Sequence, residues 1–96
     1  MNIRDLEYLA AVAELRHFKN AAYRCCVSQP TLSGQVKKLE EELNVKIFVR
    51  DRYCFEVTPI GEKIVNQVNI ALMEVYKIKR LAEKHMTSLQ PDPCLP

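Results

Sequence analysis

The stretch 28–43 constrains the fold of this chain more than any other, because it predicts an amphipathic helix with a polar outer face. Its apolar residues recur at helical spacing and form one stripe: Leu32, Val36, Leu39 and Leu43. The opposite face holds small and polar residues: Pro30, Gly34, Lys37, Lys38 and Glu41. We therefore expect one side of this helix to pack against a protein core and the other side to contact a ligand.

The beginning of this helix carries two start signals. Ser28 is a suitable N-cap, because its hydroxyl can accept a hydrogen bond from a free amide of the first turn. Pro30 is tolerated in that turn, since the amides there have no helical partner. Gly34, in contrast, costs about 1 kcal/mol relative to alanine inside a helix. Two interpretations of Gly34 stay open: it gives a docking partner room, or it is a tolerated glycine without a function.

A shorter helix and a turn precede this stretch. The apolar residues of the shorter helix form one face: Phe18, Ala21, Ala22 and Cys25. Cys26 and Val27 then make a short connection to Ser28. Two helices joined in this way are typical of the helix-turn-helix motif.

The polar residues in the first turns of the second helix predict a recognition helix for double-stranded DNA. In helix-turn-helix proteins this helix lies in the major groove, and its N-terminal residues contact base edges. Hydrogen-bond donors and acceptors for that purpose come from Gln29, Thr31, Ser33 and Gln35. Three neighbours, Pro30, Gly34 and Lys37, complete the expected DNA-binding face.

The chain begins with a predicted core helix. Asn2 can cap it, and Asp5 favours the positive end of the helix dipole. A broad apolar face follows through about Leu15, made of Leu6, Leu9, Ala10, Val12 and Ala13. Arg4 opposes the dipole in the first turn, which leaves two interpretations: a phosphate contact, or an exposed basic residue without a partner.

Two short segments after the second helix predict a β-hairpin, or wing. The segments 47–50 and 55–58 are rich in β-branched and aromatic residues, and a polar tip separates them. Arg50 and Arg52 near the tip could reach phosphates or an adjacent minor groove. The alternative is a solvated charged turn, because Asp51 between them cancels part of their field.

A long helix is predicted from Pro59 to about Met86, with Thr58 as its N-cap. Apolar residues on it step by four and three alternately, as in a coiled coil: Ile64, Val68, Ala71, Val75, Ile78 and Ala82, with Leu72 beside them. At 1.5 Å per residue the helix would be roughly 40 Å long. Folding back on its own core accounts for the N-terminal half only, so we expect a homodimer paired through this helix.

Composition agrees with one small domain and adds little about partners. The 96 residues carry a net charge of +2, so a DNA-binding surface must come from local placement of charge. The sequence has neither an apolar run long enough to cross a bilayer nor a signal-peptide pattern, so we expect a cytoplasmic protein with no membrane partner. No catalytic pattern is present either, and we predict neither an enzyme nor a cofactor.

The four cysteines, Cys25, Cys26, Cys54 and Cys94, lack the spacing of a metal site. We interpret them as reduced thiols. Two less favoured hypotheses remain: a zinc site that also uses His17 and His85, and peroxide sensing by these thiols. His17 is otherwise expected to lie at a helix end.

The predicted domain organisation has three parts. Residues 1–58 form a winged helix-turn-helix of three helices and a two-stranded wing, and 59–87 form the dimerisation helix. Residues 88–96 contain three prolines and no periodicity, which predicts a flexible tail. A chain that stops just past a connecting helix resembles a fragment whose next domain has been removed.

The run from Asn2 to Thr58 resembles the DNA-binding domain of LysR-type transcriptional regulators. The resemblance rests on these motifs: Ala21-Ala22, Ser28-Gln29-Pro30, Leu39-Glu40, and Phe48, Arg50, Thr58 and Gly61. Within the family, the peroxide-responsive regulators are the most similar over 2–9, 16–18 and 27–35.

The resemblance implies a mainly α fold, a winged helix-turn-helix with a long linker helix, which binds inverted repeats near promoters. It implies dimers through that helix, tetramers of the full-length protein, and a C-terminal effector domain that this chain lacks. By position, Gln29, Pro30, Thr31 and Ser33 match the residues that contact bases and grooves. Arg50 matches a wing contact, and Arg4 matches in the peroxide-responsive branch.

Some residues depart from the family pattern. Tyr53 stands where the wing often carries a further basic residue, and no cysteine here matches the peroxide-sensing pair. The leading hypothesis is a sequence-specific DNA-binding module that controls oxidative-stress genes. The alternatives are a LysR-type regulator of a different effector, an oligomerisation module, and a thiol or metal module.

Overall fold

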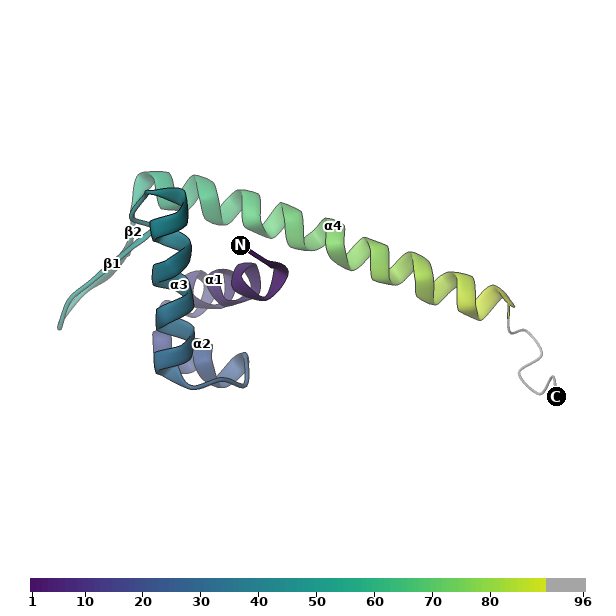
Figure 1. Cartoon of the computed structure of the whole chain (residues 1–96), viewed down its shortest axis with the longest axis horizontal. Helices are drawn as coiled ribbons and strands as arrows, with labels where there is room; N and C mark the ends of the chain where they lie inside the picture. Colours follow the sequence, from purple (N-terminus) through teal and green to yellow (C-terminus); the bar gives the residue numbers. More distant parts are fainter. Residues whose placement is uncertain (90–96) are drawn as a thin grey trace.

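The computed structural model describes residues 1–89, which form four helices and a two-stranded sheet. The helices are α1 (Ile3–Leu15), α2 (Phe18–Arg24), α3 (Gln29–Leu43) and α4 (Pro59–Leu89), and the strands are β1 (Phe48–Arg50) and β2 (Phe55–Val57). The molecule extends over 60 × 25 × 20 Å, because α4 projects far beyond a small body made of the other elements (Figure 1). The predicted mainly α winged helix-turn-helix with a long helix is confirmed.

Side chains cap the first three helices at their N-termini. The Asn2 side chain accepts from the Asp5 amide at 2.9 Å, and the Ser28 hydroxyl accepts from the Thr31 amide at 3.2 Å, as the sequence predicts. His17 is the N-cap of α2, since its Nδ1 accepts from the Asn20 amide at 3.1 Å. The prediction that His17 lies at a helix end is therefore confirmed.

The core lies where α1, α2 and α3 meet. Its fully buried side chains come from several elements: Leu9, Val12, Leu32, Leu39 and Ile47. Ala21 is also fully covered, and such a small residue lets α2 lie close to its neighbours. Leu43, which the sequence placed in the same stripe, is 37% exposed because it lies in the last turn of α3.

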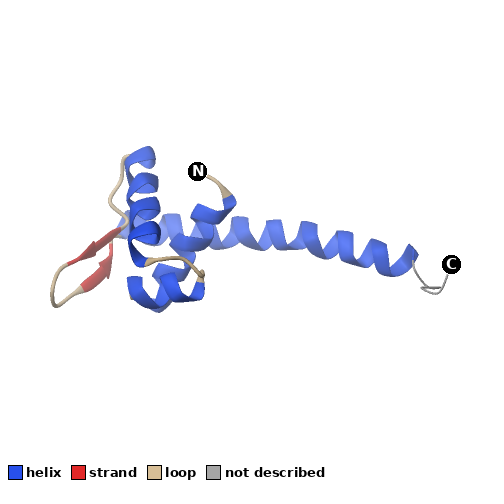
Figure 2. Cartoon of the chain, turned by 60° about the horizontal axis from the view of Figure 1, so that its bottom comes forward, coloured by secondary structure: helices blue, strands red, loops and turns tan. Residues whose placement is uncertain are grey.

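The wing pairs β1 with β2 in antiparallel register and extends away from the helices on the side opposite the free end of α4 (Figure 2). Glu40 of α3 fixes its first strand, because its carboxylate accepts from the Ile47 amide at 2.7 Å and the Phe48 amide at 3.0 Å. The Thr58 hydroxyl accepts from the Gly61 amide at 3.0 Å, which confirms it as the cap of α4. A Cβ at Gly61 would lie 2.5 Å from the Ile47 carbonyl oxygen, so only glycine fits there.

The first half of α4 packs on α1, and the second half projects into solvent (Figure 1). Val68 and Leu72 are 7% and 5% exposed. These two residues were assigned to the dimer seam, and this assignment needs correction, because they belong to the subunit's own core. Further along the helix, Ile78 and Leu81 are 66% and 67% exposed.

The predicted boundary between helix and tail differs slightly from the structure. Helix α4 continues to Leu89, whereas the tail was expected to begin at residue 88. The remainder of that predicted tail, 90–96, lies outside the described residues, and so does Cys94. Within residues 1–89, no helix is both long and apolar enough to span a membrane.

Candidate nucleic-acid interface

The N-terminal half of α3 presents its polar side to solvent. Pro30, Thr31, Gly34 and Lys37 are exposed, whereas Gln29, Ser33 and Gln35 are half-buried. The apolar side of the same turns is covered, since Leu32 and Val36 are 0% and 3% exposed. The structure therefore leaves the predicted base-contacting residues accessible and none of them in the core.

Gly34 lies in open space on this side. A Cβ built there would meet no atom within 4 Å. The fold of the subunit therefore does not require glycine at this position, in contrast to Gly61. The helix bears the cost of a glycine without an intramolecular gain.

The first turn of α3 holds two hydroxyl groups together. The Ser28 hydroxyl accepts from the Thr31 amide and donates to the Thr31 hydroxyl at 2.8 Å. This bond uses a lone pair of the Thr31 oxygen and leaves its O–H as a donor. Thr31 is thereby oriented as a donor at the surface of α3.

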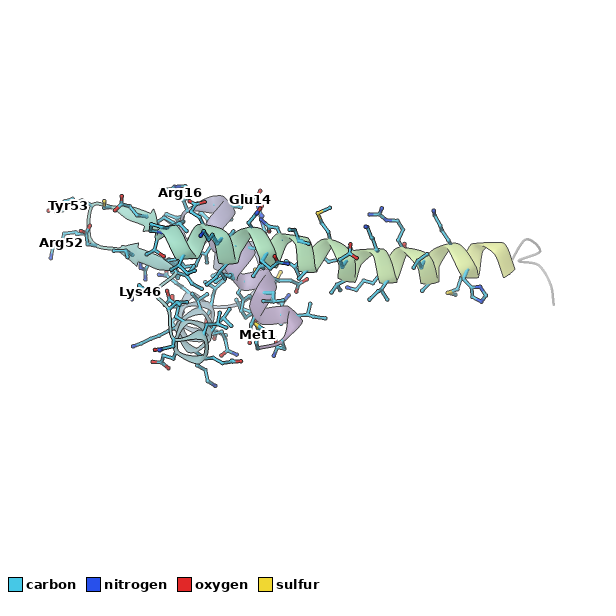
Figure 3. All side chains as sticks on the ribbon, turned by 90° about the horizontal axis from the view of Figure 1, so that it is seen from above. Met1, Glu14, Arg16, Lys46, Arg52 and Tyr53 are labelled. Atoms are coloured by element: carbon cyan, nitrogen blue, oxygen red, sulfur yellow. The ribbon has the colours of Figure 1, made fainter. Side chains whose placement is uncertain are left out.

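An internal hydrogen-bond pattern shapes the wing tip. The Asp51 amide donates to the Cys54 carbonyl at 2.9 Å, and the Asp51 carboxylate accepts from the Tyr53 amide at 2.8 Å. Asp51 therefore stabilises the turn, which explains an acidic residue between two arginines. Arg52 and Tyr53 lie at the far end of the wing (Figure 3).

Aromatic rings hold the base of the wing against α2. Phe18 contacts Phe48 and Phe55 edge to face, with both pairs of ring centroids 6.1 Å apart. The Arg50 guanidinium lies over the Phe18 ring, 3.9 Å from its centroid. Arg50 is thus held in position while its side chain remains exposed.

A recess of about 470 Å³ separates the wing from the beginning of α2 and α3. We call it the basic recess, because Arg16, Lys19, Arg50 and Arg52 line it together with one carboxylate, that of Asp51. Gln29, the first residue of α3, also lines it. The recess between α1, α2 and α4 is different, since Arg4 and Arg24 there are matched by Glu7 and Glu14.

Arg4 lies at that second recess. Its guanidinium donates to the Cys25 carbonyl at 2.5 Å, pairs with Glu7 at 3.5 Å and lies over the Tyr8 ring. Arg4 therefore joins the beginning of α1 to the helix-turn-helix turn. The structure provides the intramolecular partners that the sequence did not reveal.

The sequence analysis assigned no structural or binding role to three residues of this region. Glu40 and Arg16 entered it only through the family resemblance, and Lys19 was not singled out. Arg16 adopts a left-handed conformation with φ of 53° at the end of α1, where glycine or asparagine is usual. The break in the helical pattern near His17 and the resemblance over 16–18 were the signals that the sequence offered for this position.

The described cysteines are in different environments. Cys25 is buried and free, as its position on an apolar stripe predicted, and burial raises the pKa of its thiol. Cys26 and Cys54 are free and exposed. Among residues 1–89, no group of three or more His, Cys, Asp or Glu side chains is arranged to hold a metal ion.

Comparison with known proteins identifies the family. Residues 3–62 match the family described as bacterial regulatory helix-turn-helix protein, lysR family. The chain belongs to the lysR family. This LysR-type chain is 51% identical over 84 residues to the dual transcriptional regulator OxyR of Escherichia coli, an alignment that covers 88% of the chain and 28% of OxyR.

Solved structures agree with this assignment. A cysteine-to-aspartate variant of full-length OxyR from Pseudomonas aeruginosa matches with a TM-score of 0.83 and 46% identity, over 88% of this chain and 28% of that one. The DNA-binding domain of BenM in complex with catB site 1 DNA matches with a TM-score of 0.85 and 31% identity, over 91% and 98% of the two chains. The LysR-type chain thus has an OxyR-like winged helix-turn-helix DNA-binding domain, and it spans 28% of the length of the E. coli relative.

Proposed function

We propose that this domain recognises specific sequences in double-stranded DNA by inserting the N-terminal half of α3 into the major groove. The observation that carries the proposal is the division of α3 into a covered apolar side and an accessible polar side. The donors and acceptors on this surface can form hydrogen bonds with base edges, whereas an apolar partner would leave them without hydrogen bonds. The base contacts are assigned to Gln29, Pro30, Thr31, Ser33 and Gln35.

The remaining predicted contacts follow from their positions around α3. Gly34 lets the duplex approach the helix closely, and Lys37 contacts phosphate one turn further along. Arg50 and Arg52 contact the backbone or an adjacent minor groove from the wing. Arg4 supports DNA binding indirectly, since its hydrogen bond to the Cys25 carbonyl holds the turn between α2 and α3.

Dimerisation through α4 completes the proposal. The seam residues available to a second copy are those that the subunit leaves exposed or half-buried: Ile64, Ala71, Val75, Ile78 and Ala82. A pair of α4 helices would place two α3 helices at a defined separation, as binding to inverted repeats requires. Tetramers are expected for a full-length protein with an effector domain.

The regulatory role is proposed from the relatives. The E. coli relative is a DNA-binding transcriptional dual regulator, and several relatives are named hydrogen peroxide-inducible genes activators. We assign this chain to the control of peroxide-defence genes in the cytoplasm, through binding and without catalysis. Regulation by a different effector is the alternative within the family.

Selection of bound fragments from the genomic DNA of the source organism tests this function. We expect enrichment of interrupted inverted repeats, with clusters near peroxide-defence genes. Gln29→Ala should lower affinity for an enriched duplex and leave affinity for a scrambled duplex unchanged. Clusters at other genes would favour a different effector, and equal affinity of the unmodified domain for both duplexes would refute sequence-specific recognition.

A further inference from the structure

Arg16 occupies a position that usually belongs to another residue type. It ends α1 in the left-handed conformation, with φ of 53°, a backbone conformation that residues other than glycine and asparagine adopt infrequently. The local backbone therefore does not explain why arginine occupies this position. The contacts of its side chain offer an explanation.

The wing holds the Arg16 side chain at one side of its guanidinium group. One N–H donates to the Phe55 carbonyl at 2.9 Å, and the group lies over the Phe55 ring at 5.4 Å from its centroid. Arg16 is nevertheless exposed, and it lies at the base of the wing in Figure 3. A guanidinium has five N–H donors in a planar fork, so the bond to Phe55 leaves donors for an anion.

The anion would lie in the basic recess. Arg16 and Lys19 line it from the α1–α2 side, Arg50 and Arg52 line it from the wing, and Gln29 marks the start of α3. Four basic side chains face one carboxylate there, although the whole chain has a net charge of only +2. The Asp51 carboxylate also accepts a hydrogen bond from the Tyr53 amide, and this bond within the turn partly compensates its negative charge.

We propose that the basic recess binds the phosphodiester backbone of the DNA strand between α3 and the wing, with Arg16 as a direct phosphate contact. This inference rests on the proposed function, and it adds two residues, Arg16 and Lys19, to the DNA-binding surface. The stacking on Phe55 pre-organises Arg16, because a guanidinium held by a ring and a carbonyl loses less freedom on binding phosphate. The contact positions the domain on duplex DNA and reads no base.

The test measures how the affinity for DNA depends on salt. Each phosphate contact contributes about 0.9 to the slope of log affinity against log salt concentration. Arg16→Gly removes the charge and suits the left-handed backbone, and we expect the slope to become shallower by about 0.9 for both the enriched and the scrambled duplex. Arg16→Lys keeps the charge and should retain the slope. Lys63→Gln removes one charge on α4 outside the recess and should also retain it.

Two results would overturn the inference. An unchanged slope for Arg16→Gly would show that Arg16 contacts no phosphate. Equal loss of slope in Arg16→Gly and Arg16→Lys would show that Arg16 acts only by attaching the wing to α1, since both variants lose the planar contact with Phe55. Thermal unfolding checks that each variant folds, and Arg16→Asn, which also tolerates the left-handed region, replaces Arg16→Gly if that variant does not.

The failure of the proposed function is visible in a different comparison. It would appear as equal affinity of the unmodified domain for enriched and scrambled duplexes. The dependence of affinity on salt concentration can be measured with either duplex, so the phosphate contact is tested independently of base recognition.

Discussion

Helices α3 and α4 are both amphipathic, but the subunit covers their apolar stripes to different extents. In α3, Leu32, Val36 and Leu39 are at most 3% exposed, and the accessible side is polar. In α4, Leu72 is the last buried residue of the described side chains and Val75 is half-buried, whereas Ile78 and Leu81 are 66% and 67% exposed.

This difference indicates two kinds of partner for two helices of one chain. A polar accessible side can exchange hydrogen bonds with another polar surface at little cost, as DNA grooves require. An apolar accessible side gains free energy only when another apolar surface removes it from water. The difference therefore supports the proposal that α3 contacts DNA and that α4 pairs with a second copy of the chain.

Replacing Ile78 with glutamate should have the largest effect. The change places a charge in the proposed dimer contact twice, at a cost of about 2 kcal/mol or more in each copy. Dimerisation should then weaken on the order of 1,000-fold. Sedimentation should show monomers for Ile78→Glu and dimers for Asn66→Asp, which adds a charge without removing apolar surface. Persistent dimers of Ile78→Glu would place the interface elsewhere.

Ser33→Asp addresses the polar side of α3. In the proposed complex the added carboxylate would face phosphates and base edges, and we expect about 100-fold weaker binding to an enriched duplex. Circular dichroism should show unchanged helix content, because the residue is only half-buried. The same control, Asn66→Asp, has an equal charge change away from α3. Undiminished binding by Ser33→Asp would contradict the proposed placement of α3 in the groove.

Glu40→Ala tests how α3 positions the wing. The substitution leaves the Ile47 and Phe48 amides without their acceptor, and we expect a loss of about 2 kcal/mol in the free energy of unfolding. Glu41→Ala, at an exposed position on the same helix, should change stability little. Chemical denaturation measures both. Equal stability of the two variants would mean that solvent replaces the Glu40 carboxylate.

Gly34→Ala separates stability from binding. The added methyl group meets no atom of the chain, so α3 should be stabilised by about 1 kcal/mol. Affinity for an enriched duplex should fall nonetheless, because the methyl group would lie on the proposed DNA-binding side of α3. Gly61→Ala has the opposite effect on stability, since its Cβ would collide with the Ile47 carbonyl. Unchanged affinity of Gly34→Ala would make Gly34 a tolerated glycine, the other interpretation of the sequence.

Alkylation rates should show the smallest effect. Burial raises the pKa of the Cys25 thiol, so a smaller fraction is thiolate at neutral pH, and the thiolate is the reactive form. We expect iodoacetamide to modify Cys26 and Cys54 well before Cys25, with the order read by peptide mapping. This order would argue against peroxide sensing by Cys25, and early modification of Cys25 would favour the thiol hypothesis.

Much of the fold could be predicted from local sequence patterns. The caps at Asn2, Ser28 and Thr58 and the left-handed end at Asn44 follow from the chemistry of a few adjacent residues. The wing strands also follow from local composition, and their observed bounds lie within the predicted segments. Such features depend on interactions across three or four residues, which a pattern reports directly.

The contacts between distant segments could not be predicted in the same way. Glu40 bonds amides seven and eight positions away, and Arg16 bonds the Phe55 carbonyl across 39 positions. A glutamate on a helix has the same local pattern whether it is solvated or bonded to a loop. The basic recess likewise depends on the approach of α2 to the wing, which the aromatic rings of Phe18, Phe48 and Phe55 fix.

Helix α4 shows the difference between what the sequence determines and what tertiary packing determines. Its repeating apolar residues were enough to establish a long helix with one apolar side, because periodicity is a property of the chain alone. Which of those residues the subunit itself buries depended on where α1 lies against the helix. Tertiary packing places Val68 and Leu72 in the core and leaves Ile78 at the surface, since an apolar side chain is buried only where another part of the fold packs against it.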